Sequence, residues 1–203
     1  MPEGDINQAV ELFKSRDQRK RRWAIDLASE LGSPEAAALL VKALQDQSWS
    51  LREYAIERSA KLGRSMVAPL CRLLNSGIWF SRAAAVQALR AIGDPRALGP
   101  LCQVAGDGNR SVADSARAAI EALISGLGPE RIMEQAGSMI SGQKRSLAAI
   151  AARTNPGMAA ALNAADAPPA KEDDGIDPEI LQKLRTALKT AAKQETKCED
   201  EEP

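Results

Sequence analysis

Apolar and small residues recur along this chain with a period of about thirty. Alanine stands at positions 24, 55, 85 and 116, and leucine at 40, 70 and 101 forms a second column in the segments before these alanines. After Ala55 the stripe continues four and seven residues later, at Ser59 and Leu62, which is the spacing of one face of a helix. The pattern predicts a series of similar helical units.

Turn residues divide each unit into two helices. Gly32, Ser33 and Pro34 follow one apolar stripe, and Gly93, Asp94 and Pro95 follow another. A glycine suits the left-handed end of a helix, Ser or Asp caps the next helix, and proline is tolerated in its first turn. The sequence therefore predicts that one helix ends and the next begins at these places, and Gly63 takes the equivalent position in the second unit.

One helical hairpin of this size cannot cover its own apolar face, so the units must stack. The predicted fold is all-α: an α-α superhelix, or HEAT-like and armadillo-type solenoid, of four to five helical hairpins, followed by an amphipathic helix. The expected boundaries are a solenoid over 1–165 with units at about 5–32, 33–63, 64–93, 94–127 and 128–165, an acidic, proline-rich linker over 166–177, and the amphipathic helix with an acidic tail over 178–203. In the fifth unit the expected pair of helices covers 129–141 and 143–154.

Composition narrows the class of function. The 203 residues are 44% apolar but only 3% aromatic and contain no histidine, which favours helices over sheets and excludes histidine-based metal sites and nucleophile pairs. The three cysteines (Cys71, Cys102 and Cys198) form no CxxC pair, which favours reduced thiols. With no signal-like apolar segment and no run long enough to span a membrane, a cytoplasmic protein is expected.

The repeat resembles the short HEAT-like repeats of the phycobilin lyase family. The residues that carry the resemblance are Asp46, Leu51, Arg52, Ala55, Leu62 and Gly63, together with Ser81, Arg82, Ala85, Ile92 and Gly93. The resemblance is good over about residues 5–124, and Ala113 and Ile124 depart from it in the fourth unit. It implies that the second helix of each unit lines the concave side, and that Pro69 and Pro100 bend the first helices.

The predicted partner-binding residues lie on the second helices. Trp23 and Tyr54 occupy the column just before the repeated alanine, and they are accompanied by Asp26, Glu57, Arg58, Gln87 and Arg90. Rigid aromatic rings among mixed charges are typical of a protein-binding groove. A second interpretation stays open, in which both rings lean into the gap between units.

Other repeated residues have a structural interpretation. The arginines at 21, 52 and 82 are expected to bind an acid or carbonyl in a neighbouring turn rather than a ligand. Trp49 and Trp79, thirty residues apart, are expected to pack as a stacked pair on the turn, with exposed anchors for a partner as the alternative. Cys71 and Cys102 are expected to be buried free thiols.

Charge is unevenly distributed, although the formal net charge is zero. Residues 1–165 hold 21 of the 27 Lys and Arg and 16 of the 27 Asp and Glu, whereas the remaining residues are acidic. The basic cluster near the N-terminus consists of Lys14, Arg16, Arg19, Lys20, Arg21 and Arg22. An excess of five positive charges is modest for tracking phosphates, so nucleic acid is disfavoured as a partner.

Together these features predict a non-catalytic scaffold or regulatory adaptor that binds another protein on the concave face. No catalytic residues, metal, cofactor or membrane contact are expected. The C-terminal amphipathic helix is expected to dock either in the groove of its own chain or on a partner. Two alternatives stay open, a phycobilin-lyase-like enzyme and a nucleic-acid-binding helical-repeat protein.

Overall fold

The computed structural model describes residues 5–166, which form eleven α-helices and two short 3-10 helices. The predicted linker from 167 onward and the predicted amphipathic helix over 178–203 lie outside the described residues, so the docking of that helix stays a prediction. The described helices are α1 (Ile6–Phe13), α2 (Gln18–Leu31), α3 (Pro34–Ala43), α4 (Trp49–Leu62), η1 (Gly63–Met66), α5 (Val67–Leu74), α6 (Trp79–Ile92), η2 (Pro95–Ala97), α7 (Leu98–Val104), α8 (Arg110–Gly126), α9 (Pro129–Gly137), α10 (Ser141–Thr154) and α11 (Pro156–Asp166).

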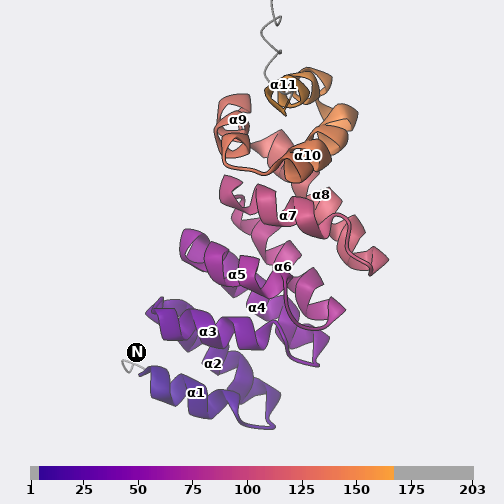
Figure 1. The fold of residues 1–203 in the computed structure, drawn as a ribbon. Coiled ribbons are helices and arrows are strands. Elements are labelled where there is room, and N and C mark those ends of the chain that lie inside the picture. Colours follow the sequence, from indigo (N-terminus) through magenta and orange to yellow (C-terminus); the bar gives the residue numbers. More distant parts are fainter. Residues whose placement is uncertain (1–4, 167–203) are drawn as a thin grey trace, which may run out of the picture. The chain divides into compact units, whose positions relative to one another are not determined.

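Residues 5–166 form a stack of helical hairpins, which confirms the predicted all-α superhelix. Helices α1, α3, α5 and α7 form one row, and α2, α4, α6 and α8 form a second row behind it (Figure 1). The second helices contact one another along the stack more extensively than the first helices do, so their row is the inner side of the curve. We call this row the second-helix row.

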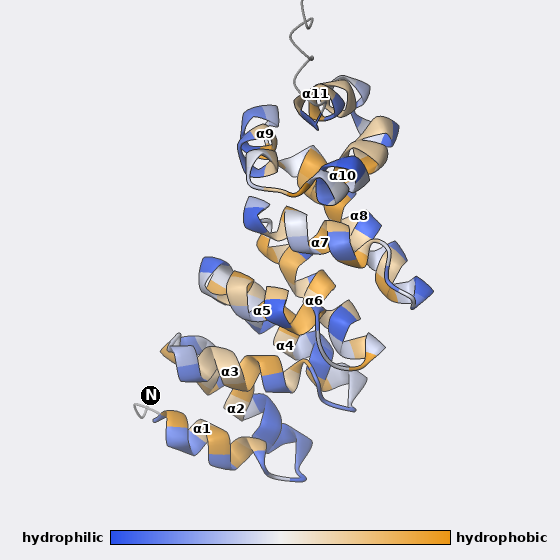
Figure 2. Cartoon of the chain, in the orientation of Figure 1, coloured by the Kyte–Doolittle hydropathy of each residue, from blue (hydrophilic) through white to orange (hydrophobic). Residues whose placement is uncertain are grey.

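The hydrophobic core runs along the stack between the two rows. Hydrophobic residues gather along the inside, and polar residues occupy the turns and outer faces (Figure 2). The alanines of the repeated column and the leucines of the second column are all fully buried: Ala24, Ala55, Ala85, Ala116, Leu40, Leu70 and Leu101. Small alanines let the second helices approach closely, and each leucine fills the space between successive units.

The helix ends follow the local signals in the sequence. Gly32 and Gly93 have φ of 61° and 72° and end α2 and α6 in the left-handed conformation. Ser33 then accepts a hydrogen bond from the backbone N–H of Ala36 at 3.2 Å and caps α3, with Pro34 in its first turn. After Gly93 the chain forms the 3-10 helix η2 before α7. The turn at Gly93 is therefore followed by a short 3-10 helix, whereas the turn at Gly32 is followed directly by the α-helix α3.

The prolines inside the first helices stand near a change of helix type. Pro69 is the third residue of α5 and Pro100 the third of α7, and each of these helices follows a 3-10 helix. Proline has no N–H to donate to the carbonyl four residues earlier, and that carbonyl lies in η1 for Pro69 and in η2 for Pro100. Each proline therefore lies in the first turn of a short α-helix that follows a 3-10 segment, and the bend expected from the sequence stays a prediction.

The arginine column binds the turns between the helices. The Arg82 guanidinium donates to both carboxylate oxygens of Asp107 in the next unit, at 2.8 and 2.9 Å, and to the Gly77 carbonyl of its own turn at 2.8 Å. The Asp107 hydrogen bond raises the pKa of Arg82, and the same bond lowers the pKa of Asp107. Arg21 also forms an ion pair with the equivalent aspartate of the next unit, Asp46.

Arg52 is the exception in this column. The turn of the next unit carries Ser76 and Gly77 where an aspartate would receive Arg52. Its guanidinium donates instead to the Asp46 and Gln47 carbonyls of its own turn, at 2.7 and 2.9 Å, and lies 4.5 Å over the ring of Phe80. In the fourth unit, where Ala113 replaces the arginine, Arg117 one turn later donates to the Ala105 carbonyl at 2.8 Å.

The fifth hairpin differs from the one expected. Helices α9 and α10 correspond to the expected pair, but α10 packs most extensively against α11, which the sequence analysis did not predict. Asn155 and Pro156 begin α11, where the Asn155 side chain accepts from the Met158 N–H at 3.0 Å. Leu162 is fully buried on this helix, so α11 supplies the apolar face that covers α10.

Helix α10 also packs against α7 and α8 and closes this end of the stack. Gly99 on α7 permits the approach, because a Cβ at this position would lie 3.3 Å from Oε1 of Gln143. Ser146 donates to the Cys102 carbonyl at 3.4 Å across the same contact. Cys71 and Cys102 are free, and burial raises the pKa of the Cys102 thiol to about 12.

One buried hydroxyl gives a prediction for stability. Ser59 takes a core position of the stripe in α4, is fully buried, and its Oγ has no hydrogen-bond partner among the described residues. Because a buried hydroxyl without a partner has lost its hydration, Ser59→Ala is expected to raise the free energy of unfolding by about 1 kcal/mol. Urea denaturation measures the change.

The matched control is Ser125→Ala in α8. Ser125 is exposed, and its hydroxyl donates to the Glu121 carbonyl at 2.9 Å. Both substitutions gain the higher helix propensity of alanine, so the difference between them isolates the buried hydroxyl. Equal changes in the two variants would contradict the prediction.

Candidate partner-binding surface

Two grooves on the second-helix row contain part of the predicted binding set. The α2/α4 groove is lined by Gln8, Trp23, Asp26, Leu27, Ser29, Glu30, Arg58 and Lys61. The α4/α6 groove is lined by Trp49, Arg52, Glu53, Ile56, Trp79, Phe80, Ala83, Ala84 and Gln87. Of the seven predicted residues, Trp23, Asp26 and Arg58 fall in the first groove and Gln87 in the second. Tyr54, Glu57 and Arg90 line neither, so the structure does not bring the seven into one site.

Trp23 and Tyr54 differ although they share a column. Trp23 is 47% exposed at the wall of the α2/α4 groove. Tyr54 is half-buried; its hydroxyl donates to Oδ1 of Asp26 at 2.6 Å, and the Arg22 guanidinium lies 4.3 Å over its ring. Tyr54 therefore leans into the gap between α2 and α4, and Trp23 points toward solvent.

Arg58 completes this contact between the first two units. Its guanidinium donates to the Tyr54 hydroxyl and pairs with Asp26 at 2.7 Å. Burial raises the pKa of Tyr54, and the hydrogen bond to Tyr54 raises the pKa of Arg58. The phenol thus stays protonated and Arg58 stays charged, so the network holds α4 against α2.

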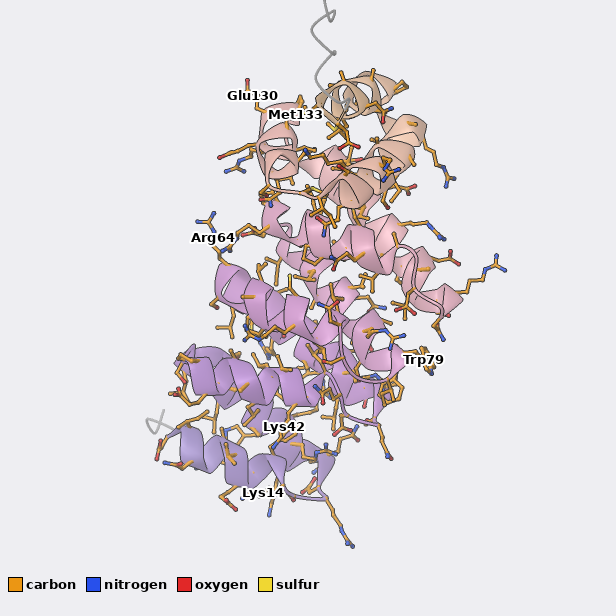
Figure 3. All side chains as sticks on the ribbon, in the orientation of Figure 1. Lys14, Lys42, Arg64, Trp79, Glu130 and Met133 are labelled. Atoms are coloured by element: carbon orange, nitrogen blue, oxygen red, sulfur yellow. The ribbon has the colours of Figure 1, made fainter. Side chains whose placement is uncertain are left out.

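The α4/α6 groove contains two tryptophans that the sequence analysis expected to be packed. Trp49 is 67% exposed and Trp79 is 51% exposed, and the aromatic partner of Trp79 is Phe80, edge to face at 5.8 Å. The expected stacked pair of Trp49 and Trp79 is wrong. Each residue opens its helix, and a helical side chain points toward the N-terminus, so these rings project past the helix end (Figure 3 labels Trp79).

The groove between these tryptophans has a volume of about 470 Å³ and is lined by both apolar and polar side chains. Ile56, Ala83 and Ala84 belong to its apolar lining. The Arg52 guanidinium is occupied by the turn carbonyls and by Phe80. The Glu53 carboxylate is exposed and has no ion pair among residues 5–166. The arrangement suits an apolar side chain seated between the indoles, with a donor facing Glu53.

Among residues 5–166, no group of three or more Cys, Asp or Glu is placed to hold a metal ion. No helix in this range combines the length and apolarity that crossing a bilayer requires.

The fold and its repeats make the described part of the chain a HEAT-like α solenoid. Consistent with this class, a family model described as HEAT repeats matches residues 44–124, from the end of α3 to α8. A comparison with curated proteins finds no match.

Several solved structures are similar. One is a designed armadillo repeat protein, with 20% identity over 83% of this chain and 94% of that chain, at a TM-score of 0.43. Another is a designed armadillo repeat protein in complex with the peptide (KR)4, with 20% identity over 92% of this chain and 99% of that chain, at a TM-score of 0.39. A third is an engineered protein with 19% identity over 80% of this chain and 79% of that chain, at a TM-score of 0.42.

Proposed function

We propose that the chain is a protein-binding scaffold or regulatory adaptor, and that a segment of another protein docks across the second-helix row with its main contact in the α4/α6 groove. The observation that supports this most is the exposure of Trp49 and Trp79 at equivalent positions of neighbouring units, on either side of one groove. Tryptophan is a rare residue in this chain, and two of its three copies stand here.

The energetics favour a protein ligand at this groove. An exposed indole gains free energy when a partner removes it from water, and tryptophan side chains in the centre of interfaces commonly contribute about 2 kcal/mol or more each. The rings are rigid, so ordering them on binding costs little conformational entropy. The small side chains of Ala83 and Ala84 in its lining leave room for a bulky apolar residue of the partner.

The surroundings of the groove resemble the rim of an interface. Glu53 and Gln87 belong to its lining, and Glu57 and Arg90 are exposed on the same two helices. Polar side chains around an apolar centre give orientation and specificity to the contact. Trp23 in the α2/α4 groove extends the surface by one unit.

The proposal predicts that the double variant Trp49→Ser, Trp79→Ser loses its partner. The full-length chain is immobilised and exposed to cell extract, and bound proteins are quantified by mass spectrometry. Loss of two central indoles is expected to reduce the specific partner at least tenfold. The control is Ile140→Ser, which removes a similarly exposed apolar side chain, 65% exposed, from the start of α10.

Equal capture by the double variant, the control and the unaltered chain would contradict the proposal. Circular dichroism checks that both variants keep their helices. The sequence-based alternatives, a phycobilin-lyase-like activity and nucleic-acid binding, stay predictions, as do the expected absence of catalysis and the cytoplasmic location.

A further inference from the structure

A second pocket lies at the opposite end of the second helices from Trp49 and Trp79. It is formed where α4 and α6 end and where α9 passes, and its volume is about 600 Å³. Its lining consists of Gly63, Arg64, Ile92, Gly93, Asp94, Pro95, Arg96, Arg131, Glu134 and Gln135. We call it the arginine pocket, because three arginines from three segments of the chain line it.

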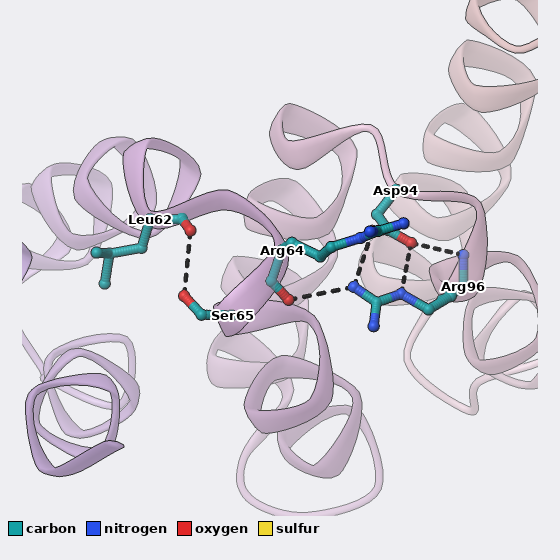
Figure 4. Close-up of polar contacts among 5 residues, drawn as sticks. All are labelled: Leu62, Arg64, Ser65, Asp94 and Arg96. Atoms are coloured by element: carbon teal, nitrogen blue, oxygen red, sulfur yellow. Dashed lines mark hydrogen bonds and ion pairs between the residues drawn. The ribbon is translucent and has the colours of Figure 1, made fainter. Parts of the chain in front are cut away.

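A buried carboxylate organises two of these arginines. The Asp94 side chain is only 7% exposed and accepts from the backbone N–H, Nε and Nη2 of Arg96, each at 2.9 Å (Figure 4). Nε of Arg64 donates to the same carboxylate at 3.4 Å. Hydrogen bonds from Arg96 hold the pKa of Asp94 at about 2, below its ordinary value of 3.8.

The pair joins equivalent positions of successive units. Arg64 follows Gly63 just as Asp94 follows Gly93, so these two residues hold equivalent positions in successive units. Asp94 therefore contacts its own counterpart in the preceding unit. Arg96 Nη2 also donates to the Arg64 carbonyl at 3.3 Å. The Arg96 guanidinium is therefore held in place before any ligand arrives, whereas the Arg64 guanidinium has a single long contact with Asp94.

Several donors in the pocket remain unused by residues 5–166. The Arg64 side chain is 80% exposed, and its two terminal nitrogens have no acceptor within the described range. The same holds for Nη1 of Arg96 and for the exposed Arg131 on α9. Nothing lies within 4 Å of a Cβ placed at Gly63 or Gly93, so the backbone leaves the space beside these donors open.

The charge of the lining indicates the class of ligand. The lining contains three guanidinium groups and the carboxylates of Asp94 and Glu134, which leaves one positive charge in excess. A carboxylate neutralises that excess, whereas a doubly charged phosphoryl group would leave a net negative charge beside Glu134 and the buried Asp94. Guanidinium forks bind carboxylates through two parallel hydrogen bonds.

We propose that the arginine pocket binds a carboxylate side chain of an acidic peptide segment in a partner protein. The site is separate from the α4/α6 groove and does not depend on the function proposed there. Arg64 and Arg131 supply the exposed forks, Asp94 fixes Arg96, and the bound carboxylate takes the place of water on these donors.

The test uses the full chain and a fluorescein-labelled peptide with four glutamates separated by glycines. Fluorescence anisotropy at low salt measures binding to the unaltered chain and to the double variant Arg64→Gln, Arg131→Gln. The variant is expected to bind at least fivefold more weakly. The control is Arg110→Gln, Arg153→Gln, which removes the same charge from side chains that are 94% and 75% exposed elsewhere, and it is expected to stay within twofold.

Two further peptides test which acidic group the arginine pocket binds. The peptide with glutamine in place of glutamate is expected not to bind, and the peptide with phosphoserine is expected to bind no more tightly than the glutamate peptide. Equal weakening by the two arginine pairs, or unchanged binding in the pocket variant, would overturn the site. Tighter binding of phosphoserine would overturn the assignment to carboxylates. Trp49→Ser, Trp79→Ser is expected to leave this binding unchanged, which separates the site from the groove.

Discussion

Replacing Ala85 with leucine is expected to lower the free energy of unfolding by about 1–3 kcal/mol, and more if the second helices cannot separate. Ala85 is fully buried in α6, in the column that also contains Ala24, Ala55 and Ala116. The helices α4, α6 and α8 pack side by side at this column, so three additional carbon atoms have no free volume to enter. Urea denaturation followed by circular dichroism measures the loss.

Ala91→Leu on the same helix is the control for this variant. Ala91 is exposed in the last turn of α6, so leucine there keeps the helix propensity without overpacking the core. Its free energy of unfolding is expected to change by less than about 0.5 kcal/mol. If both leucines had the same effect, the close approach of the second helices at the alanine column would be refuted.

The second large effect is expected from Asp94→Ala, with a loss of about 2 kcal/mol at neutral pH. The substitution removes the cap of η2 and leaves the Arg64 and Arg96 guanidinium groups without their shared acceptor. Asp114→Ala is the control, because its carboxylate is 54% exposed and pairs with surface arginines. That variant is expected to lose less than about 1 kcal/mol.

The contribution of Asp94 depends on pH with a defined sign. Its pKa is about 2 in the folded chain and 3.8 ordinarily, so the folded state favours the ionised form. The stabilisation is fully present above about pH 5 and declines as the pH falls toward about 1. The stability difference between the unaltered chain and Asp94→Ala should shrink across this range, and a difference that is constant with pH would contradict the assignment.

Local rules explain why the fold could be predicted from the sequence. The thirty-residue period, the glycines at 32 and 93 and the cap at Ser33 each act within a few residues, and together they give the helices and their stacking. Helix α11 was missed although Asn155 and Pro156 form a recognisable helix start. Which helix pairs with α10 depends on tertiary packing against Leu162, and the weakened repeat pattern beyond residue 124 does not encode it.

The binding surface was less accessible to sequence reasoning. Periodicity identifies the face of a helix on which a residue lies, but the exposure of Trp49 and Trp79 depends on their being the first residues of their helices. Trp23 and Tyr54 share one column, yet Tyr54 is drawn inward because Asp26 and Arg58 are present to bind its hydroxyl. The arginine pocket includes Arg131 of α9. The position of α9 depends on packing at the end of the stack where the repeat pattern weakens, so the sequence did not indicate this pocket.

Arg52 has no aspartate in the next unit to bind, so the solenoid is expected to be more flexible at this position than between its other units. Arg21 and Tyr54 tie the first unit to the second through polar bonds, and Arg82 and Arg64 tie the third to the fourth. Between the second and third units, within residues 5–166, α4 and α6 are joined by apolar packing and by Arg52 over Phe80. Apolar contacts resist sliding less than directional bonds do, so bending and torsion should concentrate at this seam, which carries the α4/α6 groove.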